Sequence, residues 1–371
     1  MQAVILVGGE GTRLRPLTST VPKPVVPLVD RPFMAYMLEW LARHGVEDVV
    51  LACGFLPTLL REALGDGARY GVRLTFVEEP EPMGTGGALR YAAEQLPGGL
   101  AERFLMLNGD VLTDADVRGQ IDQHEATGAR ATLGLVPVED PSAYGLVRLA
   151  PDRAVRGFLE KPRPEEIDTN LISAGIYVLD HSVLDLIEPG RSVSIEHEVW
   201  PRLVGDGLYG TAHEGAYWLD IGTPERYLEG TRDILAGAVR TTVRERLDAH
   251  GLARGAGCHV DGHLRGPVVM GDDCVIAEGA VVGPHAVLGD RVTIEPGATV
   301  EDAVVLANAV VGRGSVVRGA ILAAGAQLGA DCRVGGRAVL GEGVRLGAGN
   351  VVDRGMRLFP GVELPDGGVA F

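Results

Sequence analysis

The segment Val4-Ile-Leu-Val-Gly-Gly-Glu-Gly-Thr-Arg-Leu-Arg-Pro16 joins a short apolar run to a glycine-rich loop. An apolar run that ends in glycines is typical of a buried strand leading into a loop. Glycines let backbone N–H groups approach an anion closely, and Arg13 adds a guanidinium that matches phosphate oxygens. The loop lacks the Gly-Lys-Ser/Thr of a Walker motif and the G-x-G-x-x-G dinucleotide fingerprint. It predicts phosphate binding after a first strand, although a plain tight turn would use the same glycines.

Strand and helix signals alternate through the first half of the chain. Strands are predicted over 46–52, 70–77, 104–107, 131–138 and 174–179, and helices over 32–44 and 224–238. Strands interleaved with helices imply a mostly parallel sheet that is covered on both faces. Such sheets bind ligands beyond the carboxyl ends of their strands, so the predicted fold is an α/β domain with its site at that edge.

A hexapeptide repeat follows residue 257. One aliphatic residue recurs every six positions, with a slip of one residue before Val311 and another before Leu322: Leu264, Met270, Ile276, Val282, Leu288, Ile294, Val300, Leu306, Val311, Val317, Leu322, Leu328, Val334, Leu340, Leu346, Val352, Leu358 and Leu364. A six-residue period fits a parallel β-helix whose sides each use one hexapeptide. Each slip is expected to mark an irregular turn or a break. Cys274 and Cys332 occupy a slot for small residues and are predicted to fill the core.

Charge and cysteine usage exclude several functional classes. Acidic residues outnumber basic ones 50 to 34, for a formal charge of −16, which argues against a nucleic-acid-binding surface. Summed charge does not exclude a local positive pocket. No run of about 18 apolar residues occurs and the first residues lack a signal-peptide pattern, so no membrane span and a cytoplasmic location are predicted. Four cysteines lie far apart without a C-x-x-C pair, which fits neither a zinc site nor a disulfide framework.

The two lysines of the chain, Lys23 and Lys161, are each followed by proline, in Pro22-Lys-Pro24 and Glu160-Lys-Pro162. Arginine serves at every other basic position apart from the histidines. A lysine offers a compact, strongly hydrated ammonium in place of a planar fork. The pattern favours two phosphate-facing lysines over a chance placement of two rare residues.

Five segments together resemble the sugar-1-phosphate nucleotidyltransferases. They are Leu6-Val-Gly-Gly-Glu-Gly-Thr-Arg-Leu-Arg-Pro-Leu-Thr18 with Pro22-Lys-Pro-Val-Val-Pro27, Gly84-Thr-Gly-Gly-Ala88, Asn108-Gly-Asp110, Phe158-Leu-Glu-Lys-Pro162 and Trp218-Leu-Asp-Ile-Gly-Thr-Pro224. All occur in the family's order, and a hexapeptide-repeat tail is common there, so the resemblance covers essentially the whole chain. It implies a Rossmann-like (GT-A type) catalytic domain over 1–235, a linker over 236–256 and a left-handed β-helix over 257–371.

The resemblance implies that the chain joins an NTP to a sugar 1-phosphate, giving an NDP-sugar and pyrophosphate. A phosphate monoester is largely dianionic at pH 7, since its second pKa is about 6, so no general base is required. The implied catalytic residues are Arg13 and Lys23 at the triphosphate, Lys161 at the sugar phosphate, and Asp110 and Asp220 as ligands of Mg²⁺. The implied binding residues are Leu6, Gly8, Gly9, Gly11, Thr12, Gly84, Thr85 and Asn108 for the nucleotide, and Gly145, Glu160 and Ser173 for the sugar.

Each of these residues also fits a structural explanation when it is taken alone. Asp110 could cap a helix and Asp220 could stabilise the turn before Pro224, whereas Glu160 and Lys161 could form a solvated pair. The joint occurrence in family order favours the site.

The motifs look most like guanylyltransferases for mannose 1-phosphate, with thymidylyl- and uridylyltransferases for glucose as alternatives. One departure concerns the sugar, because Ser173-Ala-Gly175 stands where the family usually has Asn-Ala-Gly. A non-catalytic, nucleotide-sugar-binding regulatory subunit is a second alternative. A third is an acyltransferase tail that uses His259, His263 or His285 as a base, against which surface histidines are the simpler explanation. Stacking of β-helices predicts a homo-oligomer.

Overall fold

The computed structural model describes residues 1–54, 56–160 and 162–370, which form two compact units. The first unit comprises residues 1–10 and 34–220, and the second comprises 11–33 and 221–371. The early segment groups with the later one partly because the Tyr227 hydroxyl donates a hydrogen bond to the carbonyl of Pro27. The sequential division at residues 235 and 257 stays a prediction.

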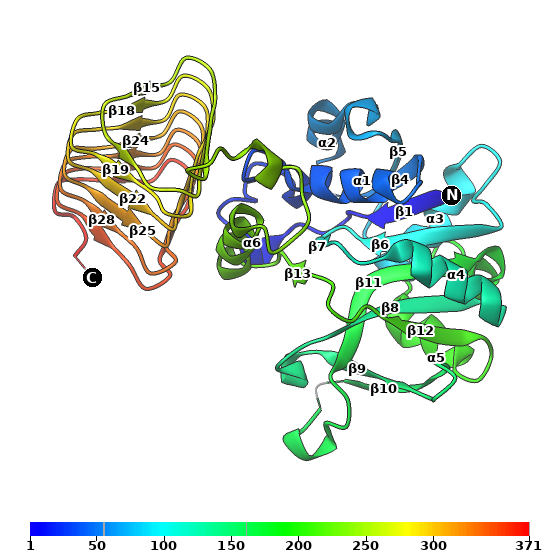
Figure 1. The fold of residues 1–371 in the computed structure, drawn as a ribbon. Helices are drawn as coiled ribbons and strands as arrows, with labels where there is room; N and C mark the ends of the chain where they lie inside the picture. The colour runs from blue at the N-terminus through cyan, green and yellow to red at the C-terminus, as the bar shows by residue number, and fades with distance from the viewer. Residues whose placement is uncertain (55, 161, 371) are drawn as a thin grey trace. The chain divides into compact units, whose positions relative to one another are not determined.

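The first unit is built on one nine-stranded sheet (Figure 1). Its strands are β1 (Gln2–Leu6), β4 (Asp48–Cys53), β5 (Arg73–Glu78), β6 (Arg103–Asn108), β8 (Ala131–Pro137), β9 (Gly145–Leu149), β10 (Val155–Glu160), β11 (Leu171–Asp180) and β12 (Leu208–Ala212). The order is β10-β9-β11-β6-β1-β4-β5, with β8 between β11 and β12. The predicted parallel sheet is confirmed in β6-β1-β4-β5, and antiparallel β11 extends it.

Helices flank this sheet, and the first of them confirms the helix predicted over 32–44. They are α1 (Phe33–Arg43), α2 (Pro57–Leu64), α3 (Gly84–Gln95), α4 (Val117–Thr127) and α5 (Trp200–Leu203), with short 3-10 turns at Ala68–Tyr70, Pro141–Ala143, Pro164–Glu166 and His181–Leu186. On one face, Val4 and Met106 of the sheet share a buried cluster with Leu89 of α3 and Trp200 of α5. The strand predicted from residue 70 begins at Arg73 because the preceding 3-10 turn ends at a left-handed glycine, Gly71, with φ of 80°. In the described part of the chain, no helix is both long and apolar enough to cross a membrane.

Buried polar side chains connect α4 to the sheet. Gln120 donates from Nε2 to the carbonyls of Thr132 (2.9 Å) and Ile176 (3.2 Å). Nε2 of His213 lies 3.0 Å from Oε1 of Gln120, and Nδ1 of His124 lies 2.9 Å from the Thr132 hydroxyl. His124 and His213 are 1% and 6% exposed, and burial lowers the pKa of both.

These two histidines predict that the first unit loses stability in mild acid. Their ordinary pKa of about 6.5 holds in the unfolded chain, which therefore takes up protons below that pH while the folded chain resists. The full contribution of the two neutral histidines to the free energy of unfolding is present above about pH 6.5. As the pH decreases from there, each histidine lowers the free energy of unfolding by up to about 1.4 kcal/mol per pH unit. Urea unfolding between pH 8 and pH 5 measures the slope. His213→Gln should reduce the slope and exposed His259→Gln should not; an unchanged slope for both would contradict the prediction.

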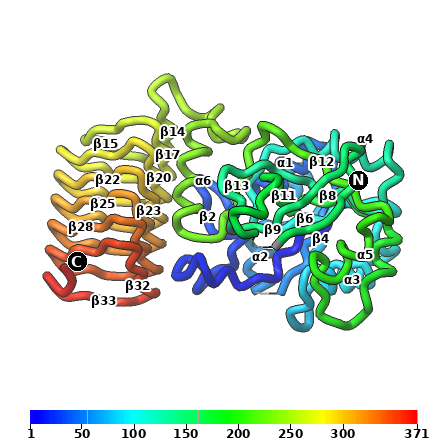
Figure 2. The backbone as a smooth tube through the Cα atoms, turned by 90° about the horizontal axis from the view of Figure 1, so that it is seen from below, coloured from blue at the N-terminus to red at the C-terminus, as the bar shows by residue number. Residues whose placement is uncertain are grey.

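The second unit contains a parallel β-helix, as the hexapeptide period predicted. Three parallel sheets of seven, seven and six strands form its sides, as expected for a left-handed β-helix, and successive coils are stacked in Figure 2. Its strands are β14 (Leu252–Arg254), β15 (His259–Val260), β16 (His263–Leu264), β17 (Val268–Met270), β18 (Val275–Ile276), β19 (Val281–Val282), β20 (Ala286–Leu288), β21 (Thr293–Ile294), β22 (Thr299–Glu301), β23 (Val304–Val305), β24 (Val310–Val311), β25 (Val316–Arg318), β26 (Ile321–Leu322), β27 (Gln327–Leu328), β28 (Arg333–Val334), β29 (Val339–Leu340), β30 (Arg345–Leu346), β31 (Val351–Val352), β32 (Arg357–Leu358) and β33 (Glu363–Leu364). Because β14 pairs with β17, the stacked sheets begin inside the stretch predicted as linker.

The frame slips do not break the β-helix. Both lie at the same corner, between β22 and β23 and between β25 and β26, and parallel pairing continues past them. The core position in β23 is Val305, which is fully buried in the central cluster, so the first slip follows Val300. The assignment of Leu306 to the core frame was therefore wrong, because a corner one residue shorter brings Val305 inward. Cys274 and Cys332 are fully buried in this core as predicted, and burial raises the pKa of Cys274 to about 11.

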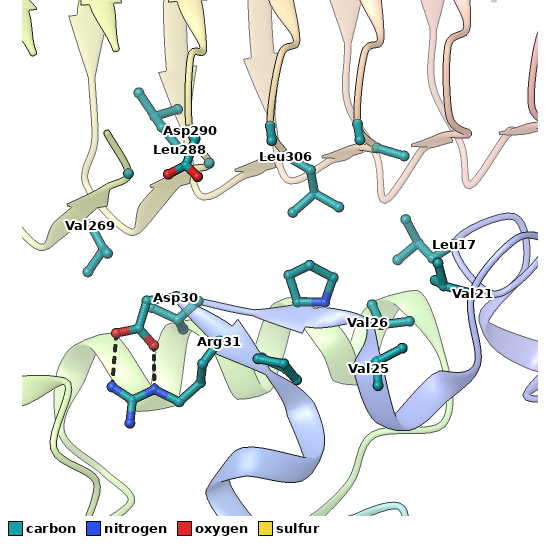
Figure 3. A pocket seen from close by; sticks show the side chains of 18 of the residues that line it. Leu17, Val21, Val25, Val26, Asp30, Arg31, Val269, Leu288, Asp290 and Leu306 are labelled. Atoms are coloured by element: carbon teal, nitrogen blue, oxygen red, sulfur yellow. Dashed lines mark hydrogen bonds and ion pairs between the residues drawn. The ribbon is translucent and has the colours of Figure 1, made fainter. Parts of the chain in front are cut away.

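Leu306 instead lines a cavity of about 590 Å³ within the second unit (Figure 3). The opposite wall is the segment 16–32, which includes 3-10 turn Lys23–Val25 and the short strands β2 (Pro27–Leu28) and β3 (Arg31–Pro32). Leu17 and Val26 of that segment lie across from Leu288 and Leu306 of the β-helix. The remaining elements of the unit are the 3-10 turns Thr12–Leu14 and Arg244–Arg246 and helix α6 (Pro224–Ala236).

Candidate active site

The residues predicted to meet nucleotide and sugar in the first unit lie on neighbouring strands. Leu6, the last residue of β1, is paired with Asn108 at the end of β6. The β11–β6 register continues to place Gly175 opposite Asn108. A Cβ atom at Gly175 would lie 2.9 Å from Nδ2 of Asn108, and its φ is 70°, so only glycine fits there. This close approach holds the Asn108 side chain at the strand ends.

The residues predicted to contact the sugar lie on β9, β10 and β11 of the same sheet. Gly145 of β9 is paired with Glu160 of β10, and the single β11–β9 bridge places Ser173 next to Gly145. Ser173 forms a 3.0 Å hydrogen bond with the buried hydroxyl of Tyr177. Lys161 and the Glu160 side chain lie outside what the structure describes, so their contacts stay predictions.

The two predicted metal ligands lie at the ends of a small two-stranded sheet. In it β7 (Val111–Thr113) runs antiparallel to β13 (Trp218–Asp220), and Asp220 is the partner of Val111. Asp110 directly precedes Val111, so the backbones of Asp110 and Asp220 are close in the register of this pair. Hard divalent cations such as Mg²⁺ prefer carboxylate oxygens, usually one or two from the protein with phosphates and water completing the shell. The donor set fits, and no group of three or more His, Cys, Asp or Glu side chains suited to a metal occurs among the described residues.

Of the two glycines after β1, Gly8 is closely packed and Gly9 is not. A Cβ atom at Gly8 would lie 2.8 Å from Oε1 of Glu79, whose pKa burial raises. Gly54 also packs against Gly8, since its own added Cβ would lie 2.9 Å from the Gly8 carbonyl. A Cβ at Gly9 would meet nothing within 4 Å, and its φ is not left-handed. Within the described residues, the protein itself does not require glycine at position 9.

Gly9→Ala therefore separates folding from ligand binding. We expect the variant to unfold at the parental temperature, because the added methyl group enters open space. If the backbone at Gly9 contacts the nucleotide, the methyl group should raise KM for NTP by about tenfold or more. Steady-state kinetics with each substrate varied in turn measures this, alongside thermal unfolding. An unchanged KM for NTP would remove Gly9 from the site.

The glycine-rich start of α3 is held against residues 191–196. The amides of Gly86 and Gly87 both donate to the carbonyl of Val193, at 2.8 and 3.2 Å. The Thr85 hydroxyl donates to Oε2 of Glu196 (2.7 Å) and accepts from the amide of Ile195 (2.9 Å). These two glycine amides are therefore engaged within the protein, and the glycines serve close packing of the helix start.

The predicted triphosphate residues of the second unit also lie together. Gly11 has φ of 62°, and a Cβ there would lie 3.2 Å from Cβ of Lys23. Lys23 is 9% exposed and begins its own 3-10 turn, whereas Arg13 is exposed on the turn Thr12–Leu14. Arg357 of the β-helix donates to the carbonyls of Arg13 (2.9 Å) and Arg15 (3.0 Å). The loop is thus held from its backbone side, and the Arg13 guanidinium is left on the surface.

Three residues at the site escaped the sequence reasoning: Glu79, Tyr177 and Glu196. Each belongs to no motif; Glu79 and Glu196 contact segments far apart in the chain, whereas Tyr177 bonds to Ser173, four residues earlier in β11. A buried-strand pattern marked Tyr177, but it gave no reason to assign its hydroxyl to a site. In the β-helix, His259 is exposed and forms an ion pair with Asp261 at 3.0 Å, in line with a surface histidine.

Comparison with known proteins identifies the family of the chain. Residues 2–237 match the family model described as nucleotidyl transferase, and residues 264–364 match that of the GMPPB C-terminal domain. The chain belongs to the nucleotidyl transferase family. The parallel strands that carry Leu6 and Asn108 lie inside the first match, and the hexapeptide repeat supplies nearly all of the second.

Several curated relatives of this chain are named as established or probable mannose-1-phosphate guanylyltransferases. A mannose-1-phosphate guanylyltransferase of Mycobacterium tuberculosis is 41% identical over 240 residues, which are 64% of this chain and 65% of that protein. A probable mannose-1-phosphate guanylyltransferase of Oryza sativa is 39% identical over 282 residues, 75% of this chain and 74% of that protein. The chain thus spans less than two thirds of the first relative's length.

Solved structures match 62% of this chain. HddC from Yersinia pseudotuberculosis is 28% identical with a TM-score of 0.54, over 62% of this chain and 97% of that chain. A second structure of HddC, complexed with GMP-PN, is similar over the same shares with a TM-score of 0.53.

Proposed function

We propose that this chain catalyses transfer of a nucleotidyl group from GTP to mannose 1-phosphate, giving GDP-mannose and pyrophosphate. The observation that carries the proposal is the pairing of Asp220 with Val111, the residue after Asp110, shortly beyond the end of β6 at Asn108. The names of the relatives support the substrates, and the HddC complex with GMP-PN supports the guanine nucleotide.

The chemistry requires two anions to be held together. A phosphate oxygen of the sugar attacks the α-phosphorus of the nucleotide, a new P–O bond forms, and the bond to the β-phosphate breaks as pyrophosphate leaves. Arg13 and Lys23 neutralise the triphosphate, and Lys161 holds the sugar phosphate. The nucleotide is bordered by Leu6, Gly8, Gly9, Gly11, Thr12, Gly84, Thr85 and Asn108. The sugar is contacted by Gly145, Glu160 and Ser173.

Asp110 and Asp220 are the residues that would hold a magnesium ion. When bound, the ion supplies positive charge that stabilises the phosphate oxygens and the leaving pyrophosphate. Mg²⁺ itself, a cytoplasmic location and a homo-oligomer remain parts of the proposal.

A panel of nucleotides against sugar 1-phosphates, followed by release of pyrophosphate, tests the function. We expect GTP with mannose 1-phosphate to react fastest, activity to require Mg²⁺ and EDTA to abolish it. A clear preference for dTTP or UTP with glucose 1-phosphate would replace the guanylyl assignment by the thymidylyl or uridylyl alternative. Binding of GDP-mannose without any pyrophosphate release would instead indicate a regulatory subunit.

A further inference from the structure

Glu196 accepts a hydrogen bond from the start of α3, at Thr85. One of its oxygens, Oε2, accepts hydrogen bonds from the hydroxyls of Thr85 (2.7 Å) and Ser194 (2.8 Å). Among the described residues, the other oxygen, Oε1, accepts no hydrogen bond. The side chain is partly exposed. A carboxylate oxygen that has no hydrogen bond of its own, beside an oxygen that is fixed, is a ready acceptor for a ligand.

The backbone around Glu196 is unusual and well fixed. Residues Ile195–Val199 form a single π-helical turn, capped by the Ser194 hydroxyl, which accepts from the amide of His197. Short π-helical turns are rare and frequently occur at functional sites, because they re-aim one side chain. Val193 fixes the start of the segment by donating its amide to the carbonyl of Met83. The carboxylate is therefore held in one place before any ligand arrives.

The charge of Glu196 acts on the row of predicted sugar contacts. Burial raises the pKa of the Tyr177 hydroxyl, and the negative charges of Glu196 and Asp110 raise it further. That hydroxyl is bonded to Ser173, which stands next to Gly145. Ile195 and Val199 of the same turn share a buried cluster with Tyr177, so the turn that carries Glu196 packs beside the Tyr177–Ser173 pair.

We propose that Glu196 determines sugar specificity by accepting a hydrogen bond from one ring hydroxyl of the hexose 1-phosphate through Oε1. This inference rests on the proposed function and extends it to a residue outside the motifs. A carboxylate repels a phosphate group but accepts strongly from a hydroxyl, so the group it recognises belongs to the neutral ring. The Ser173–Tyr177 pair supplies a second polar contact on the same side of the ring.

Glu196→Gln tests the proposal, because glutamine keeps the size and the acceptor for Thr85 but removes the charge. We expect the variant to raise Kd and KM for mannose 1-phosphate about tenfold or more, with KM for GTP within twofold of the parent. The 2-, 3-, 4- and 6-deoxy analogues of mannose 1-phosphate locate the contact. The analogue that lacks the bonded hydroxyl should bind the parent and the variant equally well.

Glu198→Gln is the matched control, since Glu198 lies on the same π-helical turn and pairs with Arg191 and the amide of Ser194. It should leave both KM values unchanged. Calorimetric titration with mannose 1-phosphate reports on Glu196 even in the absence of turnover, so failure of the proposed reaction and failure of this inference are separate results. A raised KM for GTP, or an equal loss for every deoxy analogue, would overturn the proposal.

Discussion

Replacing Asp110 by asparagine is expected to lower turnover about a thousandfold while the fold stays intact. Asparagine keeps the size of the side chain but removes one of the two carboxylate charges that we propose to hold a divalent cation, the other being that of Asp220. Loss of charge stabilisation of several kcal/mol in the transition state corresponds to this factor, at tenfold per 1.4 kcal/mol. Pyrophosphate release at saturating GTP and mannose 1-phosphate, over a range of Mg²⁺ concentrations, measures it.

Asp152→Asn is the control for that experiment. Asp152 is an exposed aspartate whose carboxylate accepts from the amide of Ala154, so its replacement changes the same charge at a turn remote from the strand pair in sequence. It should leave turnover within twofold of the parent. If Asp110→Asn retained parental turnover in a folded sample, the carboxylate pair would not be where the reaction occurs. Asp220→Asn should repeat the loss, since both ligands serve one ion.

Gly87→Ala is expected to destabilise the first unit by about 2–3 kcal/mol, the range for overpacking a tight contact. In an open helix the substitution would stabilise by up to about 1 kcal/mol, because alanine is the better helix former. Here the new Cβ would lie 2.5 Å from the carbonyl oxygen of Arg191, which is backbone and cannot swing aside. The start of α3 must then separate from residues 191–193, and the Val193 hydrogen bonds are lost with it.

Tryptophan fluorescence isolates this effect, because Trp40, Trp200 and Trp218 are the three tryptophans of the chain and all lie in the first unit. Urea unfolding should show a lower midpoint for Gly87→Ala. Gly157→Ala is the matched control, since a Cβ there would meet nothing within 4 Å. Equal midpoints for the two variants would mean that the helix start is free to move, and the packing explanation of the glycine run would fail.

Local patterns predicted most of the elements and the motif residues. The apolar run ending at Gly8-Gly9 predicted β1, and the six-residue period predicted the stacked sheets, because both signals repeat over short distances along the chain. The period failed only at Leu306, where the corner is one residue shorter and Val305 turns inward. Asp110 and Asp220 were predicted through their motifs, and the antiparallel pairing of β7 with β13 sets Asp220 opposite Val111, the residue after Asp110.

The sequence by itself determined the fold class, the repeat and the residue types that phosphate and metal chemistry need, since hydrophobic period and motif spacing are properties of neighbouring residues. Tertiary structure alone decided the contact of Thr85 with Glu196 and the burial that lowers the pKa of His213. These depend on strand register and on the docking of α3 against residues 191–196. Contacts between segments a hundred residues apart leave no periodic trace in a single sequence, so packing must supply them.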